Sequence, residues 1–503
     1  MNKIFGIAFI TVSFFVGVTV SAAGQAAQID PLGYTISTPH PIDPAAGTTN
    51  PSALATQRQN PYLGSVPSGK ATDEVIALSL PQAIALGLRY NLGLIESNQS
   101  SADGRAQRLR ALSALLPELS LEGRQGLADQ SLKEVGLRLA SIAGFPGLPA
   151  TSGSFGFQDT RISVTQSIYN SVLRNRYQAE RKAEQASALS AADARDVVVY
   201  AVGASYLQVV AAVARVETAR AQLASARELD QQTEDRVSAQ LSPEIDSLRA
   251  QVQKHTVEQQ VTNASNDLEK AKLTLARITG LPIDQKFTAT DAAEYREVTG
   301  LTEKSAIGHA REFRADMRSA AASVREAEYR LRSEKGQRLP ALSFRADYGG
   351  AGVNVGAFSQ VYTVGGQVSL PLYTGGRIRA DIDQAQSNLT RRQAEYEDLE
   401  GRIVYDVRVA WLDMQASDSS VKVAESNRAL ADRALTQSQD RYLNGVANYL
   451  EVLRAEEAVT EAAENYIRSL YSFNVAKMAL ARAMGSAESE IQDFFGGKSQ
   501  WHN

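Results

Sequence analysis

The chain contains one order of residues twice, and this repetition constrains its fold more than any other feature. Ala83 and Leu119 recur as Ala306 and Leu342, 223 residues later. The positions matched at a spacing of 205 residues are Leu207, Arg236, Leu275 and Gly280, which recur as Leu412, Arg441, Leu480 and Gly485. A repeat of this length is no short-period solenoid, so the sequence predicts an internal tandem duplication.

The N-terminus has the composition of a secretory signal peptide. Lys3 precedes an apolar run over residues 4–20, and the small residues Ser21, Ala22 and Ala23 follow it, as at an A-x-A-like cleavage site. The run is shorter than the roughly 20 apolar residues of a membrane span, which argues against the alternative of an uncleaved anchor. We expect no second long apolar run, and therefore no transmembrane helix in the mature chain.

Composition excludes several classes of function. The 503-residue chain has no cysteine, so disulfides, cysteine-ligated metals and thiol catalysis are excluded. Its four histidines, His40, His255, His309 and His502, lack metal-ligand spacing, and we expect no metal and no cofactor. The net charge of −4 gives no reason to expect nucleic-acid binding. The sequence holds none of the common hydrolase or phosphate-loop motifs, so we expect that the chain is not an enzyme.

The repeat and the turn-forming residues divide the chain into six segments. Residues 24–77 hold seven of the fifteen prolines and little hydrophobic periodicity, so we expect an extended or disordered segment there. Each repeat is expected to contain helices, one β-hairpin (118–169 or 341–373) and a long helix pair. The predicted segments are the signal peptide 1–23, the Pro/Gly-rich extension 24–77, the first repeat 78–285, the linker 286–300, the second repeat 301–487 and the tail 488–503.

The expected hairpins alternate strictly between apolar and polar residues after Pro117 and Pro340. The polar positions include Arg345 and Asp347. The apolar positions, which we expect to face lipid, include Leu342, Phe344, Tyr348, Ile162 and Val164. Such strands of about ten residues are typical of membrane β-barrels, although a small soluble sheet packed on a helix would show the same alternation. Because four strands leave two bare edges and membrane barrels begin at about eight strands, several chains would have to share one barrel.

Two very long helices are expected at residues 171–241 and 375–443. At 1.5 Å per residue each would extend about 100 Å. In the first repeat the chain then turns back at Leu241, with Ser242 as the expected N-cap and Pro243 in the first helical turn. In the second repeat the turn contains Asn444 and Gly445. The returning helix there begins with Asn448 and Glu451, which resemble a capping box.

These features lead to a known family. The motifs that carry the resemblance are the ordered set Leu370-Pro371-Leu372-Tyr373-Thr374-Gly375-Gly376-Arg377, the turn Tyr442-Leu443-Asn444-Gly445 leading into Glu451-Val452-Leu453, and the terminal Leu480-Ala481-Arg482-Ala483-Met484-Gly485. With the duplication, they make residues 78–487 resemble the TolC-like outer-membrane efflux proteins, also called outer membrane factors.

The resemblance implies a mixed α and membrane-β fold. In such a homotrimer, three chains with four strands each close a 12-stranded outer-membrane β-barrel in contact with lipid, and a long α-helical barrel continues it through the periplasm. The implied function is the exit duct of a tripartite efflux or type I secretion system. The implied partners are a periplasmic adaptor (membrane fusion protein) and an inner-membrane RND, ABC or MFS transporter. The alternative is a periplasmic coiled-coil adaptor or scaffold without a barrel.

The resemblance also implies functional residues at the periplasmic tip. Glu451 aligns with an acidic constriction, although it would serve equally as a helix-capping residue. Arg454 lies at a neighbouring gate position, and Asp246 is a partner candidate for Arg454 or Arg441, or else a solvated surface charge. Tyr442 and Arg441 are expected to latch neighbouring helix pairs. The expected adaptor-contact residues are Asn444, Gly445, Gln240 and Leu241. Because Gln240 stands where the second repeat has Gly445, we expect the two turns to differ.

Overall fold

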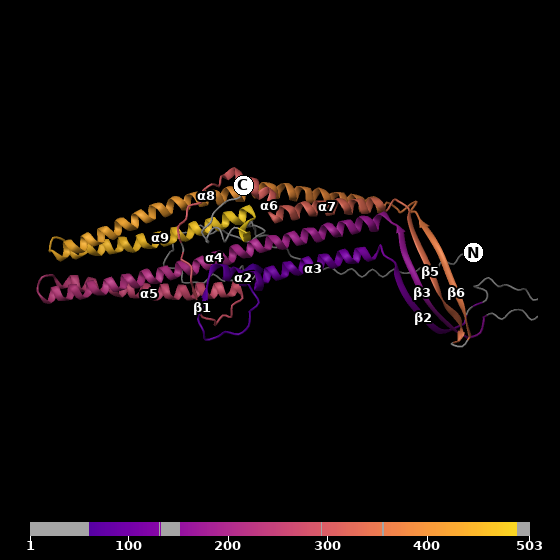
Figure 1. Ribbon diagram of the computed structural model, residues 1–503, viewed down its shortest axis with the longest axis horizontal. Helices are drawn as coiled ribbons and strands as arrows, with labels where there is room; N and C mark the ends of the chain where they lie inside the picture. Colours follow the sequence, from indigo (N-terminus) through magenta and orange to yellow (C-terminus); the bar gives the residue numbers. More distant parts are fainter. Residues whose placement is uncertain (1–59, 130, 132–150, 293, 355–356, 490–503) are drawn as a thin grey trace, which may run out of the picture. The chain divides into compact units, whose positions relative to one another are not determined.

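The computed structural model describes residues 60–129, 131, 151–292, 294–354 and 357–489 (Figure 1). Every element that it describes lies in the unit Pro61–Asn503, which separates from Met1–Asn60 by its contacts. The predicted signal peptide, most of the extension and nearly all of the C-terminal tail lie outside the described residues.

Two halves of the chain present the same elements in the same order. In the first half these are α2 (Leu80–Tyr90), α3 (Leu92–Ser113), β2 (Glu118–Ala128), β3 (Phe155–Tyr169), α4 (Ser171–Ser238) and α5 (Glu244–Thr279). In the second half they are α6 (Glu303–Phe313), α7 (Ala315–Gly336), β5 (Ala341–Asn354), β6 (Ala357–Ser369), α8 (Arg377–Leu443) and α9 (Tyr449–Met484). The long helices α4 and α8 contain 68 and 67 residues, and α5 and α9 contain 36 each.

The hairpins of the two halves form one four-stranded antiparallel sheet in the order β2-β3-β5-β6. Within the described residues, β2 and β6 each pair on one side only, so both outer edges of the sheet are open. Each strand of this sheet is 11 to 15 residues long. The sheet continues directly into the long helices, because α4 begins two residues after β3 ends.

Cross-strand register separates the sheet into an apolar and a polar face, because directly paired residues point to the same side. Ile162 pairs with Leu121 and with Tyr348, and Val164 pairs with Leu119. The polar face carries Arg161, whose guanidinium lies 2.6 Å from the Asp159 carboxylate and 3.2 Å from that of Asp347. The alternation expected from the sequence is therefore present across all four strands.

The helix α4 lies against α2, α3, α5, α7 and α9, and α8 lies against α6, α7 and α9. Two apolar cores follow: one includes Val198, Val202 and Tyr206 of α4, and the other includes Ile403 and Val407 of α8. The expectation of no second long apolar run was wrong. An 18-residue window of α4 has a mean hydropathy of 1.9, and 67% of that window is buried inside the protein. Packing against its neighbouring helices, α2 among them, accounts for this apolar run.

Short segments outside the expected repeats complete the middle of the molecule. The strand β1 (Ile76–Leu78), partly within the expected extension, pairs in parallel with β4 (Phe287–Ala289) of the expected linker. A 3-10 turn, η1 (Pro61–Leu63), precedes β1. A break at Asn91 separates α2 from α3, and the Asn91 side chain caps α3 by accepting hydrogen bonds from the amides of Gly93 and Leu94.

Candidate functional site

The turns that join α4 to α5 and α8 to α9 share one backbone geometry. Gln240 has a φ of 59° and Gly445 a φ of 71°, both left-handed. The Leu241 amide donates to the Arg236 carbonyl at 2.8 Å, and the Val446 amide donates to the Arg441 carbonyl at 2.9 Å. Both turns therefore close their helices with the hydrogen bond of a Schellman motif. The expected difference between the turns does not extend to the backbone.

Four helices meet in a small apolar core beside these turns, which we call the tip core. It consists of Leu229 of α4, Ala250 of α5, Tyr442 of α8, and Tyr449 and Val452 of α9. Tyr442 is only 3% exposed, and its ring meets that of Tyr449 edge-on with centroids 5.9 Å apart. The tip core therefore joins the α4–α5 pair to the α8–α9 pair within one chain.

A single arginine reinforces this junction between the helix pairs. The guanidinium of Arg236 on α4 lies over the ring of Tyr442 on α8, 4.9 Å from its centroid. Its Nη1 donates to the Leu443 carbonyl at 3.2 Å, and its Nε donates to Ser242 Oγ at 3.3 Å. Tyr442 thus takes part in a contact between helix pairs, but its charged partner is Arg236. Sequence reasoning missed Arg236 as a site residue, although it stands at the repeat position of Arg441.

Arg441 makes its contact within its own helix pair. Its Nε lies 3.4 Å from Oε1 of Glu451 on α9, and both side chains are partly exposed. The Glu451 amide donates to Asn448 Oδ1 at 3.2 Å, so Asn448 is the N-cap of α9 as expected. Only this half of the expected capping box is formed in the described structure, because the Glu451 carboxylate turns toward Arg441. Arg454 is exposed one turn further along α9.

Two expectations about the first turn need correction. Asp246 is only 7% exposed rather than solvated, and its Oδ1 lies 3.4 Å from Nη1 of Arg249. It pairs with neither Arg441 nor Arg454, because it faces inward in the first turn of its helix. Ser242 is not the N-cap of α5: the extended Pro243, with ψ of 148°, holds that position. The Ser242 hydroxyl instead accepts the hydrogen bond from Arg236.

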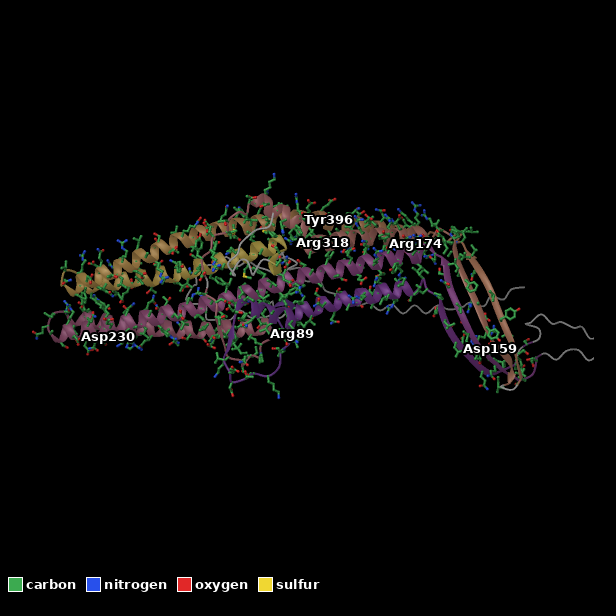
Figure 2. All side chains as sticks on the ribbon, in the orientation of Figure 1. Arg89, Asp159, Arg174, Asp230, Arg318 and Tyr396 are labelled. Carbon is green, nitrogen blue, oxygen red and sulfur yellow. The ribbon has the colours of Figure 1, made fainter. Side chains whose placement is uncertain are left out.

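The tip core also buries charged groups that sequence reasoning missed. Asp230 Oδ2 lies 2.5 Å from the ammonium group of Lys254, and Figure 2 labels Asp230 near the turn of this helix pair. Glu456 on α9 is 8% exposed, and both of its carboxylate oxygens lack a hydrogen-bond partner among the described residues. Burial raises the pKa of Glu456 to about 7. A lone Glu on a helix resembles any surface charge in sequence, so only packing reveals it.

The expected adaptor-contact residues and the expected lipid-facing residues lie at surfaces of the chain. Leu241 and Asn444 are exposed on the turns beside Gln240 and Gly445. The five expected lipid-facing residues, Leu342, Phe344, Tyr348, Ile162 and Val164, lie on the apolar face of the sheet by register. Within the described residues, no cluster of three His, Cys, Asp or Glu side chains is arranged to hold a metal ion.

Comparison with known proteins identifies the family. The profile of the family described as "Outer membrane efflux protein" matches residues 85–281 and 306–486. The outer membrane efflux protein BepC of Brucella suis is 23% identical over 244 residues, which cover 48% of this chain and 52% of BepC. The outer membrane protein TolC of Vibrio cholerae is 24% identical over 397 residues, which cover 76% of this chain and 86% of that protein. The chain thus aligns with about half of BepC and most of that TolC.

A solved structure agrees with the fold. The outer membrane channel CmeC of Campylobacter jejuni superposes with a TM-score of 0.70 at 18% identity, over 91% of this chain and 96% of CmeC. The two profile matches together cover more than half of the chain. The chain therefore belongs to the outer membrane efflux protein family and is a TolC-like protein of the outer membrane.

Proposed function

We propose that the protein is the exit duct of a tripartite efflux or type I secretion system, a passive conduit across the outer membrane and periplasm. The observation that carries this proposal is the open-edged sheet of β2, β3, β5 and β6, with one apolar and one charged face. Such a sheet cannot stand alone in lipid, because its edges expose unpaired backbone groups. Three copies joined edge to edge supply twelve strands and remove every edge.

In this assembly the two faces of the sheet have different surroundings. Leu342, Phe344 and Tyr348 face lipid, while Arg345 and Asp347 face the lumen. The arrangement follows the alternation of membrane barrels and gives water and polar cargo a charged wall. The helices α4 and α8 then continue the barrel, and about 68 residues at 1.5 Å each carry the passage roughly 100 Å into the periplasm.

The tip supplies a closure that a partner can open. Arg236 ties the α4–α5 pair to Tyr442 and Leu443 of the other pair by one cation–π contact and one hydrogen bond. Contacts of this number and strength are within reach of the binding energy of a docked protein. We assign Gly445, Asn444, Gln240 and Leu241 to the surface that binds a periplasmic adaptor. The adaptor in turn connects the duct to an inner-membrane transporter of the RND, ABC or MFS class.

Two substitutions on one strand test the barrel. Wild-type protein should fractionate with the outer membrane and migrate as a detergent-stable trimer. Tyr348→Arg places a charge in the middle of the lipid face of β5, which costs about 2–4 kcal/mol near the membrane centre, so the yield of trimer should fall sharply. Arg345→Glu changes a lumen-facing charge and should leave that yield nearly intact. Equal losses, or recovery of soluble monomer from the periplasm, would favour the scaffold alternative.

A matched pair at the second turn tests the adaptor surface. Gly445→Trp and Gly445→Ala place the same Cβ on a left-handed backbone, so they share the backbone strain and differ in bulk. We expect Gly445→Trp to abolish transport with an intact trimer yield, and Gly445→Ala to retain most transport. Full transport by Gly445→Trp would place the docking surface elsewhere.

A further inference from the structure

Four junctions between sheet and helix lie together at one end of the sheet. They are the segments from α3 to β2, from β3 to α4, from α7 to β5 and from β6 to α8. Strand register brings them side by side, because Glu118 pairs with Thr165 and Ala341 pairs with Ser369. Figure 1 shows the helices leaving the sheet at this end.

These junctions carry more positive than negative charge, with Glu118, Glu180, Glu334 and Asp381 only at their borders, although the chain as a whole has 52 basic and 56 acidic residues. The stretches 108–117, 170–179, 335–340 and 370–380 contain no Asp or Glu. We call their basic residues the basic belt: Arg108, Arg110, Arg174, Arg176, Lys335, Arg338, Arg377 and Arg379. Figure 2 labels Arg174 close to the sheet. All members except Arg108 are classed as exposed in the single chain.

Most of the basic belt is unpaired. Arg108 contacts Glu184 at 2.7 Å and Arg377 contacts Asp381 at 2.9 Å. The other six members form no ion pair with any described residue, so their charge is available to a partner outside the chain. A surface with this excess of one sign attracts an anionic partner.

Helix stability does not explain the arginines on α4 and α8. Arg174, Arg176, Arg377 and Arg379 lie near the N-termini of their helices, whose first turns contain no acidic residue. The N-terminus is the positive end of the helix dipole, where an added positive charge is unfavourable. These arginines therefore destabilise their own helices slightly, which indicates that they serve an interaction with a partner outside the chain.

Exposed aromatic and apolar residues separate the basic belt from the apolar face. Leu372 and Tyr373 are 91% and 89% exposed just after β6. A bulge between Ser167 and Tyr169 sets Tyr169 opposite Leu342, on the apolar face. The order along the chain is thus apolar strand, aromatic border, arginine. A lipid monolayer presents the same order, with acyl chains, an interface favoured by Tyr, and headgroups.

The helical geometry places arginines on both sides of the helical layer that α4 and α8 form. Residues two positions apart on a helix are separated by about 200°. Arg174 and Arg176 therefore point to opposite sides of α4, as do Arg377 and Arg379 on α8. Whichever side faces outward, each long helix presents one arginine there, and its long side chain can reach the headgroup level.

We propose that the basic belt binds the headgroups of anionic phospholipids in the periplasmic leaflet and so fixes the depth of the sheet in the membrane. The inference rests on the proposed function in one respect, namely that the sheet lies in the bilayer. Guanidinium groups recognise the phosphate of such a headgroup with paired hydrogen bonds. Neutral or zwitterionic lipids lack the net charge that the belt complements.

The test measures lipid selectivity of the full-length trimer in vesicles. Spin-labelled phosphatidylglycerol and phosphatidylcholine report the fraction of each lipid held at the protein surface. We expect wild-type protein to prefer phosphatidylglycerol by roughly threefold, since each basic group near the surface attracts anionic lipid. The triple variant Arg174→Gln, Arg176→Gln, Arg379→Gln should lose most of this preference.

A control variant carries the same change in charge elsewhere. Arg220, Arg318 and Arg433 are exposed and form no ion pair with a described residue, and replacing all three by Gln should leave the selectivity unchanged. Should the belt variant fail to assemble, wild type in 1 M KCl provides the second measurement, because salt of that concentration screens exposed charges. The preference should then nearly disappear.

The outcomes separate this inference from the proposed function. A wild-type trimer that enters vesicles but shows no preference for phosphatidylglycerol overturns the inference alone. Unchanged selectivity in the belt variant, with an altered reversal potential, would place the arginines in the lumen and also overturn it. Wild-type protein that stays in solution as a monomer overturns both.

Discussion

The two tip turns share a backbone and differ in what their arginines hold. Arg236 and Arg441 occupy equivalent positions, and each carbonyl accepts the hydrogen bond that closes its helix. The Arg236 side chain crosses to the ring of Tyr442 on the other helix pair, whereas the Arg441 side chain remains with Glu451 of its own pair. Similar backbones therefore do not give similar contacts, and under the proposed function closure of the tip would depend on the first repeat's arginine.

The turns also differ in the burial of charge behind them. Glu456 on α9 corresponds, at the 205-residue spacing, to Gln251 on α5. Glu456 is buried without a hydrogen-bond partner among the described residues, while Gln251 is exposed. The other buried carboxylates of this region, Asp230 and Asp246, pair with Lys254 and Arg249. The second helix pair thus carries a buried carboxylate, unpartnered among the described residues, at a position where the first carries an exposed amide.

The largest effect is expected from breaking the contact between pairs. Arg236→Ala removes a hydrogen bond from a charged donor and a cation–π contact, together about 2 kcal/mol. The open population of each chain's tip should rise about 30-fold, seen as higher single-channel conductance of the trimer in planar bilayers. Arg441→Ala removes one exposed pair, worth about 0–1 kcal/mol, and should change conductance little. Equal effects of the two variants would refute the asymmetry.

The next effect concerns pH. Burial raises the pKa of Glu456 from 4.5 to about 7, so the packed tip binds a proton more tightly than an opened, solvated tip. This contribution to closure is complete below about pH 4.5 and is lost as the pH rises through 7. Between about pH 4.5 and 7 the open population should grow by a factor approaching tenfold per pH unit, the limit set by about 1.4 kcal/mol, and it should level off above pH 7, where Glu456 is ionised in both states.

The pH prediction has a matched pair of variants. In Glu456→Gln the dependence of conductance on pH near 7 should flatten, because the titrating group is gone. Gln251→Glu adds a carboxylate at the corresponding exposed position and should leave the wild-type profile unchanged. A Glu456→Gln variant that keeps the wild-type profile would assign the pH response to another group.

A smaller effect follows from exchanging the left-handed residues of the turns. An added Cβ at Gly445 meets no described atom within 4 Å, so Gly445→Gln costs only the left-handed backbone, about 1 kcal/mol. Gln240→Gly relieves the same strain but adds chain entropy, for a net gain of about 0.5 kcal/mol. Hydrogen exchange should show slower opening at the Leu241 amide in Gln240→Gly, because that turn is stabilised. It should show faster opening at the Val446 amide in Gly445→Gln, because that turn is strained. Changes of the same sign in both variants would contradict equivalent backbones.

The smallest effect is expected at Glu451. Its partner Arg441 lies 3.4 Å away and neutralises part of its charge, and its amide, which Asn448 caps, is kept in Glu451→Gln. If Glu451 forms a ring around the threefold axis, neutralising it should reduce cation preference slightly, since like charges in a narrow aperture focus the field. Reversal potentials in asymmetric KCl measure this. No change would reject the gate assignment and leave Glu451 at the helix start.

Local sequence rules predicted much of the fold. The period-two alternation located all four strands and both faces of the sheet, because burial and pleat act residue by residue. Gly280 and Gly485 ended their helices with φ of 82° and 76°, as the need for a left-handed residue predicts. Pro243 shows the limit of such rules: its ring fixes φ but not ψ, and its extended ψ moved the helix start to Glu244.

The contacts of the tip were less predictable. The repeat pattern selected Arg236 and Arg441 equally, but their partners depend on how two helix pairs pack, roughly 200 residues apart in sequence. The burial of Asp246 and Glu456 likewise depends on which helix face turns inward. The small residues in these long helices leave several faces equally suited to packing. Long-range packing determines the partners and the burial of these residues, and hydrophobic periodicity alone cannot predict that packing.

In the proposed assembly, three copies share one barrel through the open edges of β2 and β6. The chain has no cysteine, so introduced pairs report unambiguously. Ser120 lies on β2, and Thr363, Gly365 and Gln367 lie on β6, at opposite edges of the sheet within one chain. Three double variants combine Ser120→Cys with a cysteine at one of these β6 positions, and each is treated with an oxidant in isolated outer membranes. At least one pair should give disulfide-linked species of two and three chains and none larger. Recovery of only the single chain with all three pairs would contradict the shared barrel.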